Sequence, residues 1–344
     1  MTVRVGINGF GRIGRNFLRA ARAQGGDVVV VAVNDLTDAK TNAHLLRYDT
    51  TYGRFDAEVS VDGDTMTVAG RPIRVLAESD PKALPWGELG AEVVLESTGR
   101  FSTREASSAH LDAGARRVII SAPATGVDAT FVIGVNDQTF DPKRHFVVSN
   151  ASCTTNCFVP MVHVLDEAFG VTSGLMTTVH AYTNDQNLLD LTHKDLRRAR
   201  AAAQNIIPAS SGAARATSLV LEAMKGRLDG AALRVPVADG SITDFTAVVR
   251  RTVSVDEVNE AFRAASREGP LSKVLVYTED PIVSSDIVGS SASCTFDAGL
   301  TMVMPVTEST TLVKAHGWYD NEWGYASRLV DLCLLIGGSG PEGS

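Results

Sequence analysis

Hydrophobic positions in the first half of the chain fall into short, nearly continuous runs, separated by segments with a helical period. The runs predict strands over residues 2–8, 27–35, 92–97, 116–123, 130–136 and 145–150. Helical spacing predicts helices over residues 12–24 and 102–113. Short apolar strands that alternate with helices are typical of an α/β domain whose parallel sheet is covered on both faces. The first half therefore predicts a doubly wound parallel sheet.

The pattern changes after residue 170, where the apolar segments become longer and regular intervening helices are fewer. They predict strands over residues 173–183, 233–237, 241–252, 274–279 and 311–319, with helices over 212–225 and 254–267. This arrangement favours an α+β domain with a mostly antiparallel sheet. A last apolar helix over residues 324–336 is expected to pack back on the first domain. We therefore predict a first domain of residues 1–152 plus 317–344 and a second domain of residues 153–316.

Composition narrows the function classes without changing this picture. The chain has 344 residues, of which 44% are hydrophobic, and a formal net charge of −8. This acidic balance argues against a general nucleic-acid or membrane-surface binder. No signal peptide or membrane span is visible, so we expect a cytoplasmic protein. Four cysteines form neither a disulfide framework nor a zinc-ligand pattern, and no metal site is expected.

A glycine-rich turn joins the first predicted strand to the first predicted helix. Gly9, Gly11 and Gly14 have the spacing G-x-G-x-x-G, and Asp35 ends the next strand. In this context the glycines let the backbone approach a pyrophosphate at the helix N-terminus, and the carboxylate can accept hydrogen bonds from a ribose. The same carboxylate would repel a 2′-phosphate. The pattern therefore predicts an NAD site in a Rossmann-type domain.

A second short segment carries candidate nucleophilic chemistry. Residues 149–157 read SNASCTTNC, and the apolar residues that follow recur with helical spacing. Cys153 is therefore expected at a helix N-terminus, where backbone amides and the helix dipole should lower the pKa of its thiol. Ser152, Thr154 and Thr155 offer hydroxyl groups to an oxyanion or a phosphate. The alternative that Cys153 is a small buried core residue stays open on these residues alone.

The second half of the chain supplies partners for such a nucleophile. His180 lies in the segment VHAYTNDQ and titrates in the range that a base for a thiol requires. Of the other six histidines, His193 and His316 also lie near polar stretches, so they stay open as candidates. Arg198 belongs to a charged run that could hold a phosphate. Arg234 lies in an otherwise apolar strand, where its guanidinium needs an anionic partner.

Taken together, these motifs resemble those of phosphorylating glyceraldehyde-3-phosphate dehydrogenases over roughly residues 2–336. The resemblance is carried by GINGFGRIGR (6–15), VAVNDLTD (31–38), STGRF (97–101), SAP (121–123), SNASCTTNC (149–157), HAYTNDQ (180–186), HKDLRRARAAA (193–203), LRVPV (233–237) and WYDNEWGY (318–325). The motifs occur in the same order as in that family.

The resemblance implies a role for each matching position. Cys153 would be the nucleophile and His180 its base. Cofactor contacts are implied for Gly9, Gly11, Arg12, Ile13, Asp35, Ser79, Ser121, Asn184 and Asn321. Substrate and phosphate contacts are implied for Ser152, Thr154, Thr183, Asp185, Arg198, Ser211, Gly212 and Arg234. The implied partners are glyceraldehyde 3-phosphate and inorganic phosphate, with NAD as cofactor, no nucleic acid and no membrane, in a homotetramer.

The implied reaction is the oxidative phosphorylation of D-glyceraldehyde 3-phosphate to 1,3-bisphosphoglycerate with reduction of NAD, through a hemithioacetal and a thioester on Cys153. Two alternatives share the scaffold, an erythrose-4-phosphate dehydrogenase and a non-catalytic NAD-binding paralogue. The sequence departs from the family pattern at Ser79, Thr192, Ser211 and residues 238–240. These departures motivate the hypothesis of a paralogue with altered sensitivity to thiol-directed inhibitors.

Overall fold

The computed structural model describes residues 2–25 and 27–338, which form two compact units. The first unit holds the described residues up to Phe131, Asp137–Ala151 and those from Ala326 onward. The second unit holds Val132–Asn136 and Ser152–Tyr325. Residues 317–325, which the sequence assigns to the first domain, belong to the second unit, because residues 317–319 complete a strand of its sheet.

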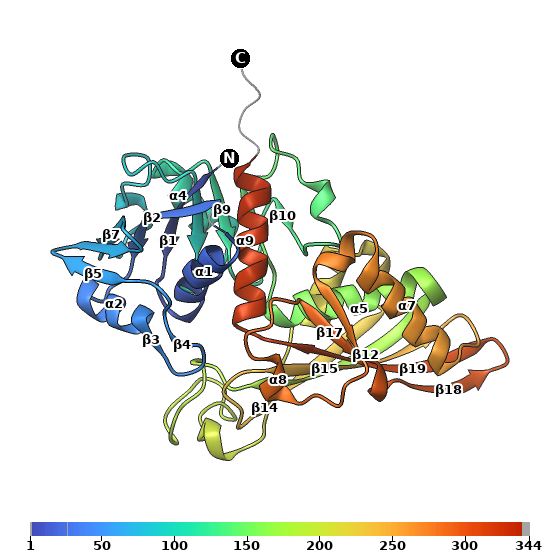
Figure 1. Cartoon of the computed structure of the whole chain (residues 1–344). Coiled ribbons are helices and arrows are strands. Elements are labelled where there is room, and N and C mark those ends of the chain that lie inside the picture. The colour runs from blue at the N-terminus through green and yellow to red at the C-terminus, as the bar shows by residue number, and fades with distance from the viewer. Residues whose placement is uncertain (1, 26, 339–344) are drawn as a thin grey trace. The chain divides into compact units, whose positions relative to one another are not determined.

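The first unit is built on a nine-stranded sheet with the strand order β10-β11-β9-β8-β1-β2-β7-β6-β5. Figure 1 labels several of these strands, among them β1, β2 and β7. Its parallel part consists of β1 (Val3–Asn8), β2 (Val28–Asn34), β7 (Arg71–Leu76), β8 (Val93–Glu96), β9 (Arg117–Ile120), β10 (Ala129–Thr130) and β11 (Val147–Ser149). The chain leaves β1 to β2 on one side and comes back to β8 on its other side. The carboxyl ends of β1 and β8 therefore mark the topological switch point, where open α/β sheets bind ligands.

This sheet confirms the predicted doubly wound α/β fold and extends it. An antiparallel hairpin of β5 (Val59–Asp62) and β6 (Thr65–Val68) continues the sheet beyond β7, and β3 (Tyr48–Asp49) pairs separately with β4 (Gly53–Arg54). The helices of the unit are α1 (Arg12–Ala23), α2 (Ala39–Arg47), α3 (Arg104–Ser107), α4 (Ala109–Asp112) and α9 (Trp323–Gly337) from Ala326 onward.

Two details of the first unit differ from the sequence prediction. The predicted helix over 102–113 is divided into α3 and α4, and Thr103 caps α3 by accepting a hydrogen bond from the amide of Ala106. The predicted strand over 130–136 is reduced to β10, because the chain after Phe131 forms turns. Helix α9 contacts this unit at both ends: Gln24 donates to the Ser327 carbonyl, and Arg117 donates to the Ile336 carbonyl at 3.0 Å.

The second unit contains an eight-stranded sheet with the order β13-β14-β12-β15-β19-β17-β16, in which β18 pairs with β19. Its strands are β12 (Val171–Ala181), β13 (Ile207–Ser210), β14 (Leu228–Val235), β15 (Ser241–Val249), β16 (Leu275–Thr278), β17 (Cys294–Asp297), β18 (Met302–Thr307) and β19 (Thr310–Tyr319). The pairs β12–β14 and β16–β17 are parallel and the other pairs are antiparallel. The predicted mostly antiparallel sheet is therefore confirmed.

The helices of the second unit are α5 (Cys153–Phe169), α6 (Ala213–Ala216), α7 (Val255–Arg267) and α8 (Ser284–Ile287). Helix α7 begins with a capping box between Ser254 and Glu257. The single helix predicted over 212–225 is wrong: α6 gives way to short 3₁₀ turns at Thr217–Leu219 and Glu222–Met224. Leu221, with φ −119° and ψ 90°, leaves the helical region between these turns.

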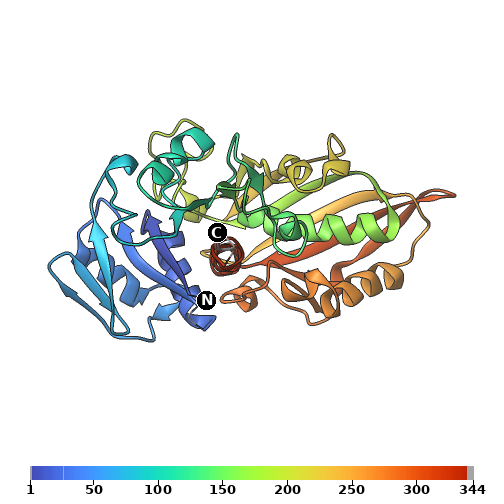
Figure 2. The same ribbon diagram turned by 90° about the horizontal axis from the view of Figure 1, so that it is seen from above.

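Helix α5 covers one face of the second sheet, and this packing positions the candidate nucleophile (Figure 2). Ser152 begins the helix by accepting a hydrogen bond from the Thr155 amide, and Gly170, with φ +72°, ends it. The ring of Phe158 on α5 meets the ring of Phe245 on β15 edge to face, with centroids 4.8 Å apart. The N-terminus of α5 is thereby fixed against the sheet.

No helix among the described residues is long and apolar enough to cross a membrane.

Candidate active site

Cys153 and His180 meet because of the side-chain alternation of β12. Met176, Thr178 and His180 are buried on the face that α5 covers, whereas Leu175 points to the other face. Cys153 is the first residue of α5, and its Sγ lies 3.5 Å from His180 Nε2. Of the three candidate histidines, His180 is therefore the one beside the thiol.

The hydrogen bonds of His180 favour the tautomer that a base requires. Its Nδ1 lies 2.7 Å from the backbone carbonyl of Ala181, which can only accept a hydrogen bond. With the proton on Nδ1, the Nε2 lone pair faces the thiol of Cys153. Arg234 Nη1 lies 2.9 Å from the same Nδ1 and satisfies its own donors with the Ala181 carbonyl and the Thr183 hydroxyl, each at 3.0 Å.

The acidity of Cys153 differs from the sequence prediction. Burial raises the pKa of the thiol to about 11, and the positive charge of Arg234 lowers it only in part. Burial also lowers the pKa of His180 to about 3, and the charge of Arg234 acts in the same direction. The expected lowering of the thiol pKa at the helix N-terminus is therefore outweighed by burial. Since the imidazole is neutral at physiological pH, it is available to accept the thiol proton.

Tyr319 links the elements that carry Cys153 and His180, a role that was not predicted from the sequence. The Tyr319 hydroxyl lies 2.8 Å from the Thr154 hydroxyl on α5 and 2.7 Å from the Thr178 hydroxyl on β12. Its ring also meets the His180 ring at a steep angle, with centroids 5.9 Å apart. Thr154, a predicted phosphate ligand, therefore already has a partner in Tyr319. The sequence signals for Tyr319 are its place in the motif WYDNEWGY (318–325) and its buried register in an alternating strand.

Four of the predicted substrate-binding residues converge next to His180. The Thr183 hydroxyl accepts from Arg234 and donates to the carboxylate of Asp185. Asp185 also forms an ion pair with Arg198. Two guanidinium groups thus stand on either side of one carboxylate and one hydroxyl. Asp195 also pairs with Arg198, at 3.5 Å, so the charges balance, but the two guanidinium groups still offer donors to an anionic group of a substrate.

The remaining predicted residues of this unit are placed separately. Ser152 uses its hydroxyl as the cap of α5, within hydrogen-bonding distance of the Thr155 hydroxyl. Ser211 and Gly212 lie at the start of α6, which packs against α5. Asn184 lies in the turn that follows Thr183. Asn321 is buried, and its Oδ1 accepts a hydrogen bond of 2.7 Å from Ser241, which leaves the amide Nδ2 as its donor. Ser241 was not predicted.

In the first unit, a cavity of about 330 Å³ lies at the topological switch point. Asn8, at the end of β1, lines it together with Gly9 and Gly11. Asp35, which follows β2, and Ser79, which follows β7, also line it. The Asp35 carboxylate is oriented by the amides of Phe10 and Thr37, at 2.9 and 3.0 Å.

Three predicted cofactor-binding residues of the first unit, Arg12, Ile13 and Ser121, do not line this cavity. Arg12 and Ile13 open α1, and the Arg12 guanidinium forms an ion pair with Asp49. Ser121 follows β9, and its amide donates to the Glu96 carbonyl.

The glycines of this turn fit a bound dinucleotide phosphate. A Cβ at Gly9, whose φ is +93°, would lie 2.7 Å from the Thr98 nitrogen, and one at Gly14 would lie 2.4 Å from the Gly9 carbonyl oxygen. At Gly11, by contrast, a Cβ would meet nothing within 4 Å, and no side chain caps α1 there. Gly9 and Gly14 are therefore required by the fold. Gly11, by contrast, keeps space open at the N-terminus of α1, a helix of twelve residues.

We predict that Gly11→Ala weakens NAD binding by about tenfold or more, because the added methyl fills the space that a phosphate needs at the helix end. The free energy of unfolding should stay within about 0.5 kcal/mol of wild type. Fluorescence titration with NAD and urea unfolding measure the two quantities. Gly9→Ala is the contrasting variant, since its methyl clashes with backbone and should lower stability. Unchanged NAD affinity in Gly11→Ala would contradict the assignment.

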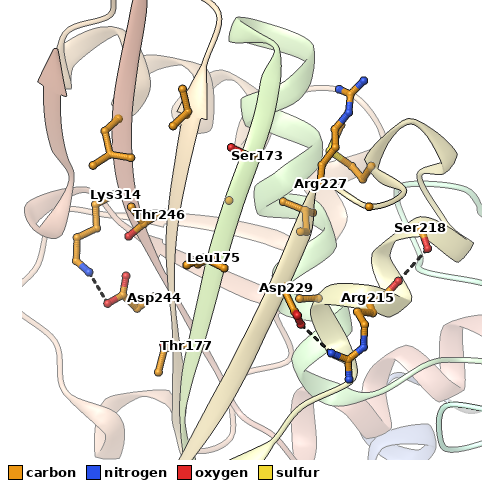
Figure 3. Close-up of a pocket in the computed structure, with 17 residues that line it drawn as sticks. Ser173, Leu175, Thr177, Arg215, Ser218, Arg227, Asp229, Asp244, Thr246 and Lys314 are labelled. Atoms are coloured by element: carbon orange, nitrogen blue, oxygen red, sulfur yellow. Dashed lines mark hydrogen bonds and ion pairs between the residues drawn. The ribbon is translucent and has the colours of Figure 1, made fainter. Parts of the chain in front are cut away.

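A broad hollow of about 920 Å³ lies on the open face of the second sheet (Figure 3). We call it the open-face hollow; among its lining residues are Leu175, Thr246, Arg215, Asp229, Asp244 and Lys314. Its charged groups are paired as Lys314 with Asp244 and Arg215 with Asp229. Neither Cys153 nor His180 lines it, so it is separate from the candidate active site.

Comparisons with known proteins show to which family the chain belongs. The NAD binding domain of glyceraldehyde 3-phosphate dehydrogenase matches residues 3–104, and the C-terminal domain of the same enzyme matches residues 152–321. Glyceraldehyde-3-phosphate dehydrogenase of Streptomyces coelicolor is 60% identical over 337 residues, which cover 98% of this chain and 99% of that protein. The chain belongs to the glyceraldehyde-3-phosphate dehydrogenase family. The enzymes of the same name from Geobacillus stearothermophilus and Mycobacterium bovis are each 56% identical, over 99% and 98% of this chain and all of their own length.

Membership of the glyceraldehyde-3-phosphate dehydrogenase family makes NAD the cofactor of the first unit. The glycine turn and Asp35 fit this cofactor, as described above.

Proposed function

We propose that this chain catalyses the oxidative phosphorylation of D-glyceraldehyde 3-phosphate to 1,3-bisphosphoglycerate with NAD, in glycolysis and gluconeogenesis. The observation that carries the proposal is the contact of 3.5 Å between Cys153 Sγ and His180 Nε2, with Arg234 directly behind the imidazole. The family assignment supports the substrate, since the full-length relatives are named for it.

The first step is addition of the thiol to the aldehyde. His180 Nε2 takes the thiol proton as Cys153 Sγ bonds to the aldehyde carbon, and the resulting imidazolium gives that proton to the aldehyde oxygen. The product is a hemithioacetal on Cys153. The substrate phosphate is held by Arg234 and Thr183, with Arg198 as the second cation of the cluster. This anchoring holds the carbonyl group beside the thiol.

The second step converts the hemithioacetal to a thioester. His180 takes the hydroxyl proton back, which re-forms the carbonyl as hydride leaves the carbon. NAD, when bound, is the acceptor of that hydride. We propose cofactor contacts for Gly9, Gly11, Arg12, Ile13, Asp35, Ser79, Ser121, Asn184 and Asn321. Asn321 is suited to an amide contact because Ser241 already occupies its oxygen.

The third step releases the product. Inorganic phosphate attacks the thioester carbonyl, the carbon–sulfur bond breaks, and Cys153 leaves as a thiolate beside the protonated His180, which returns the proton. We propose Ser152, Thr154, Ser211 and Gly212 as the site of this phosphate. Because the Thr154 hydroxyl contacts Tyr319, its contribution requires a hydroxyl that serves two partners.

We also propose that the enzyme is a cytoplasmic homotetramer. Exposed apolar side chains gather in two places of the second unit: Leu175, Met302 and Met304 on the open face of the sheet, and Leu188, Leu189 and Leu196 in the loop after β12. Clusters of this kind mark protein interfaces. Sedimentation velocity of the wild type should give a single species of four chains. Leu175→Asp, which puts a charge into the lining of the open-face hollow, should dissociate this tetramer. A monomeric wild type would contradict the proposal.

A further inference from the structure

A continuous chain of buried polar side chains runs beneath the NAD cavity. Asn34 Nδ2 donates to the Glu78 carbonyl at 2.8 Å and to Asn8 Oδ1 at 2.7 Å, while Asn34 Oδ1 accepts from the Glu78 amide at 2.8 Å. Asn8 Nδ2 then donates to Glu96 Oε2 at 2.6 Å. Asn8, Asn34 and Glu96 are all buried. These bonds connect the carboxyl ends of β7, β2, β1 and β8 in that order.

Glu96 is surrounded by hydrogen-bond donors. Its Oε1 accepts from the amide of Thr98 at 2.8 Å and from the Thr98 hydroxyl. Its Oε2 accepts from Asn8 and lies 3.1 Å from His110 Nε2. The Trp86 indole donates to His110 Nδ1 at 3.0 Å, so the histidine proton lies on Nε2 and points to Glu96. A group that accepts four hydrogen bonds at two oxygens is a carboxylate.

We propose that Glu96 is a positioning residue of the NAD site, because its carboxylate sets the direction of every hydrogen bond in this chain. With an acceptor at position 96, Asn8 must present its Nδ2 there and its Oδ1 to Asn34. Asn34 must then present its Nδ2 to Asn8 and its Oδ1 to the Glu78 amide. The orientation of Asn8 thus depends on this carboxylate, and it must match Asn34, which the Glu78 backbone also holds.

The groups that this chain orients are the ones that line the cavity. Asn8, Asn34, Glu78 and Thr98 all line it, whereas Glu96 and His110 do not. Thr98, held twice by Glu96, also accepts from the amide of Arg100 at 3.0 Å, and this contact shapes the turn over residues 97–101. Glu96 therefore acts on a bound ligand only through these residues. This inference rests on the proposed NAD-dependent function.

The variant that tests the inference is Glu96→Gln, which keeps the shape and removes the second acceptor. If the Gln oxygen stays with Thr98, its NH₂ group faces the donors of Asn8 and His110. If Asn8 then turns, the conflict moves to Asn34 and the Glu78 amide. We expect the dissociation constant of NAD, measured by fluorescence titration, to rise by about tenfold or more. The kcat at saturating NAD should change by less than about threefold while the KM for NAD rises.

The matched control is His110→Gln, whose side-chain amide can still donate to Glu96 and accept from Trp86. It perturbs the same buried cluster, and NAD affinity should stay within about twofold of wild type. If Glu96→Gln does not fold by circular dichroism, Glu96→Asp decides. It keeps the charge but is too short to reach Thr98 and Asn8 together, so its NAD dissociation constant should also rise, by about threefold or more.

A folded Glu96→Gln, or a folded Glu96→Asp in its place, with wild-type NAD affinity would overturn the inference alone. Equal losses in His110→Gln and Glu96→Gln would also overturn it, because they would indicate a general effect of the buried cluster. A wild-type chain that does not bind NAD would overturn the inference together with the proposed function.

Discussion

Replacing Cys153 with serine is expected to abolish NADH formation from glyceraldehyde 3-phosphate, with a fall in kcat of about 10⁴-fold or more. A serine hydroxyl is a far weaker acid and a poorer nucleophile than a thiol, so His180 cannot generate a comparable nucleophile from it. The measurement is initial rate at saturating substrate, NAD and phosphate. NAD binding should be retained, because Cys153 is not among the proposed cofactor contacts.

Cys157 supplies the matched control for this prediction. It lies one turn later on α5, is fully buried, and donates to the Gly317 carbonyl at 3.5 Å, a bond that a serine hydroxyl can replace. Cys157→Ser should therefore retain activity within about an order of magnitude. Loss of activity in Cys157→Ser comparable to that in Cys153→Ser would mean that helix packing, and not the thiol of Cys153, was being measured.

His180→Asn is expected to lower kcat by about 10²- to 10⁴-fold, the usual contribution of a general base. Without the imidazole, the thiol loses its base and must ionise to water, and burial already raises its pKa to about 11 in the wild-type structure. Below that pH the thiolate fraction falls about tenfold per unit, so the alkylation rate of Cys153 by iodoacetamide in this variant should rise steadily into the alkaline range. In the wild-type enzyme, His180 can take the proton as the thiol attacks, so alkylation near neutrality should be faster than in the variant.

The contrast between the two pH profiles is the informative result. His193, which carries the same type of side chain but bonds to the backbone of Asp195, is the control position, and His193→Asn should leave the profile unchanged. Identical alkylation profiles for wild type and His180→Asn would show that the imidazole does not serve the thiol. In that case another group would have to act as the base.

Local features of the sequence predicted much of the fold and, in each site, the residues of one continuous segment or turn. The glycine turn with Asp35, and the start of α5 at Cys153, depend on neighbours in sequence and on hydrophobic periodicity. The break between α6 and the 3₁₀ turns was not predictable in this way, because apolar spacing continues across Leu221. Periodicity reports the buried face and not where the backbone leaves the helix.

Contacts between distant segments account for what the sequence analysis missed. Tyr319 joins Thr154 and Thr178, which lie 165 and 141 residues away in the chain. Nothing local in any of the three segments indicates this contact. The same holds for the raised pKa of the Cys153 thiol, since the helix position was visible in the sequence but the burial that opposes it was not. Ser241 and Glu96 likewise gain their roles only from partners brought together by the sheets.

The central claim, phosphate-dependent oxidation of an aldehyde at Cys153, is tested most directly by NADH absorbance with glyceraldehyde 3-phosphate and NAD, in the presence and absence of inorganic phosphate. The account predicts sustained turnover that requires phosphate and is lost in Cys153→Ser. Sustained turnover without phosphate would contradict it, since the thioester would then pass to water, as expected for an erythrose-4-phosphate dehydrogenase. Absence of NADH in both cases with NAD still bound would leave only a non-catalytic NAD-binding protein.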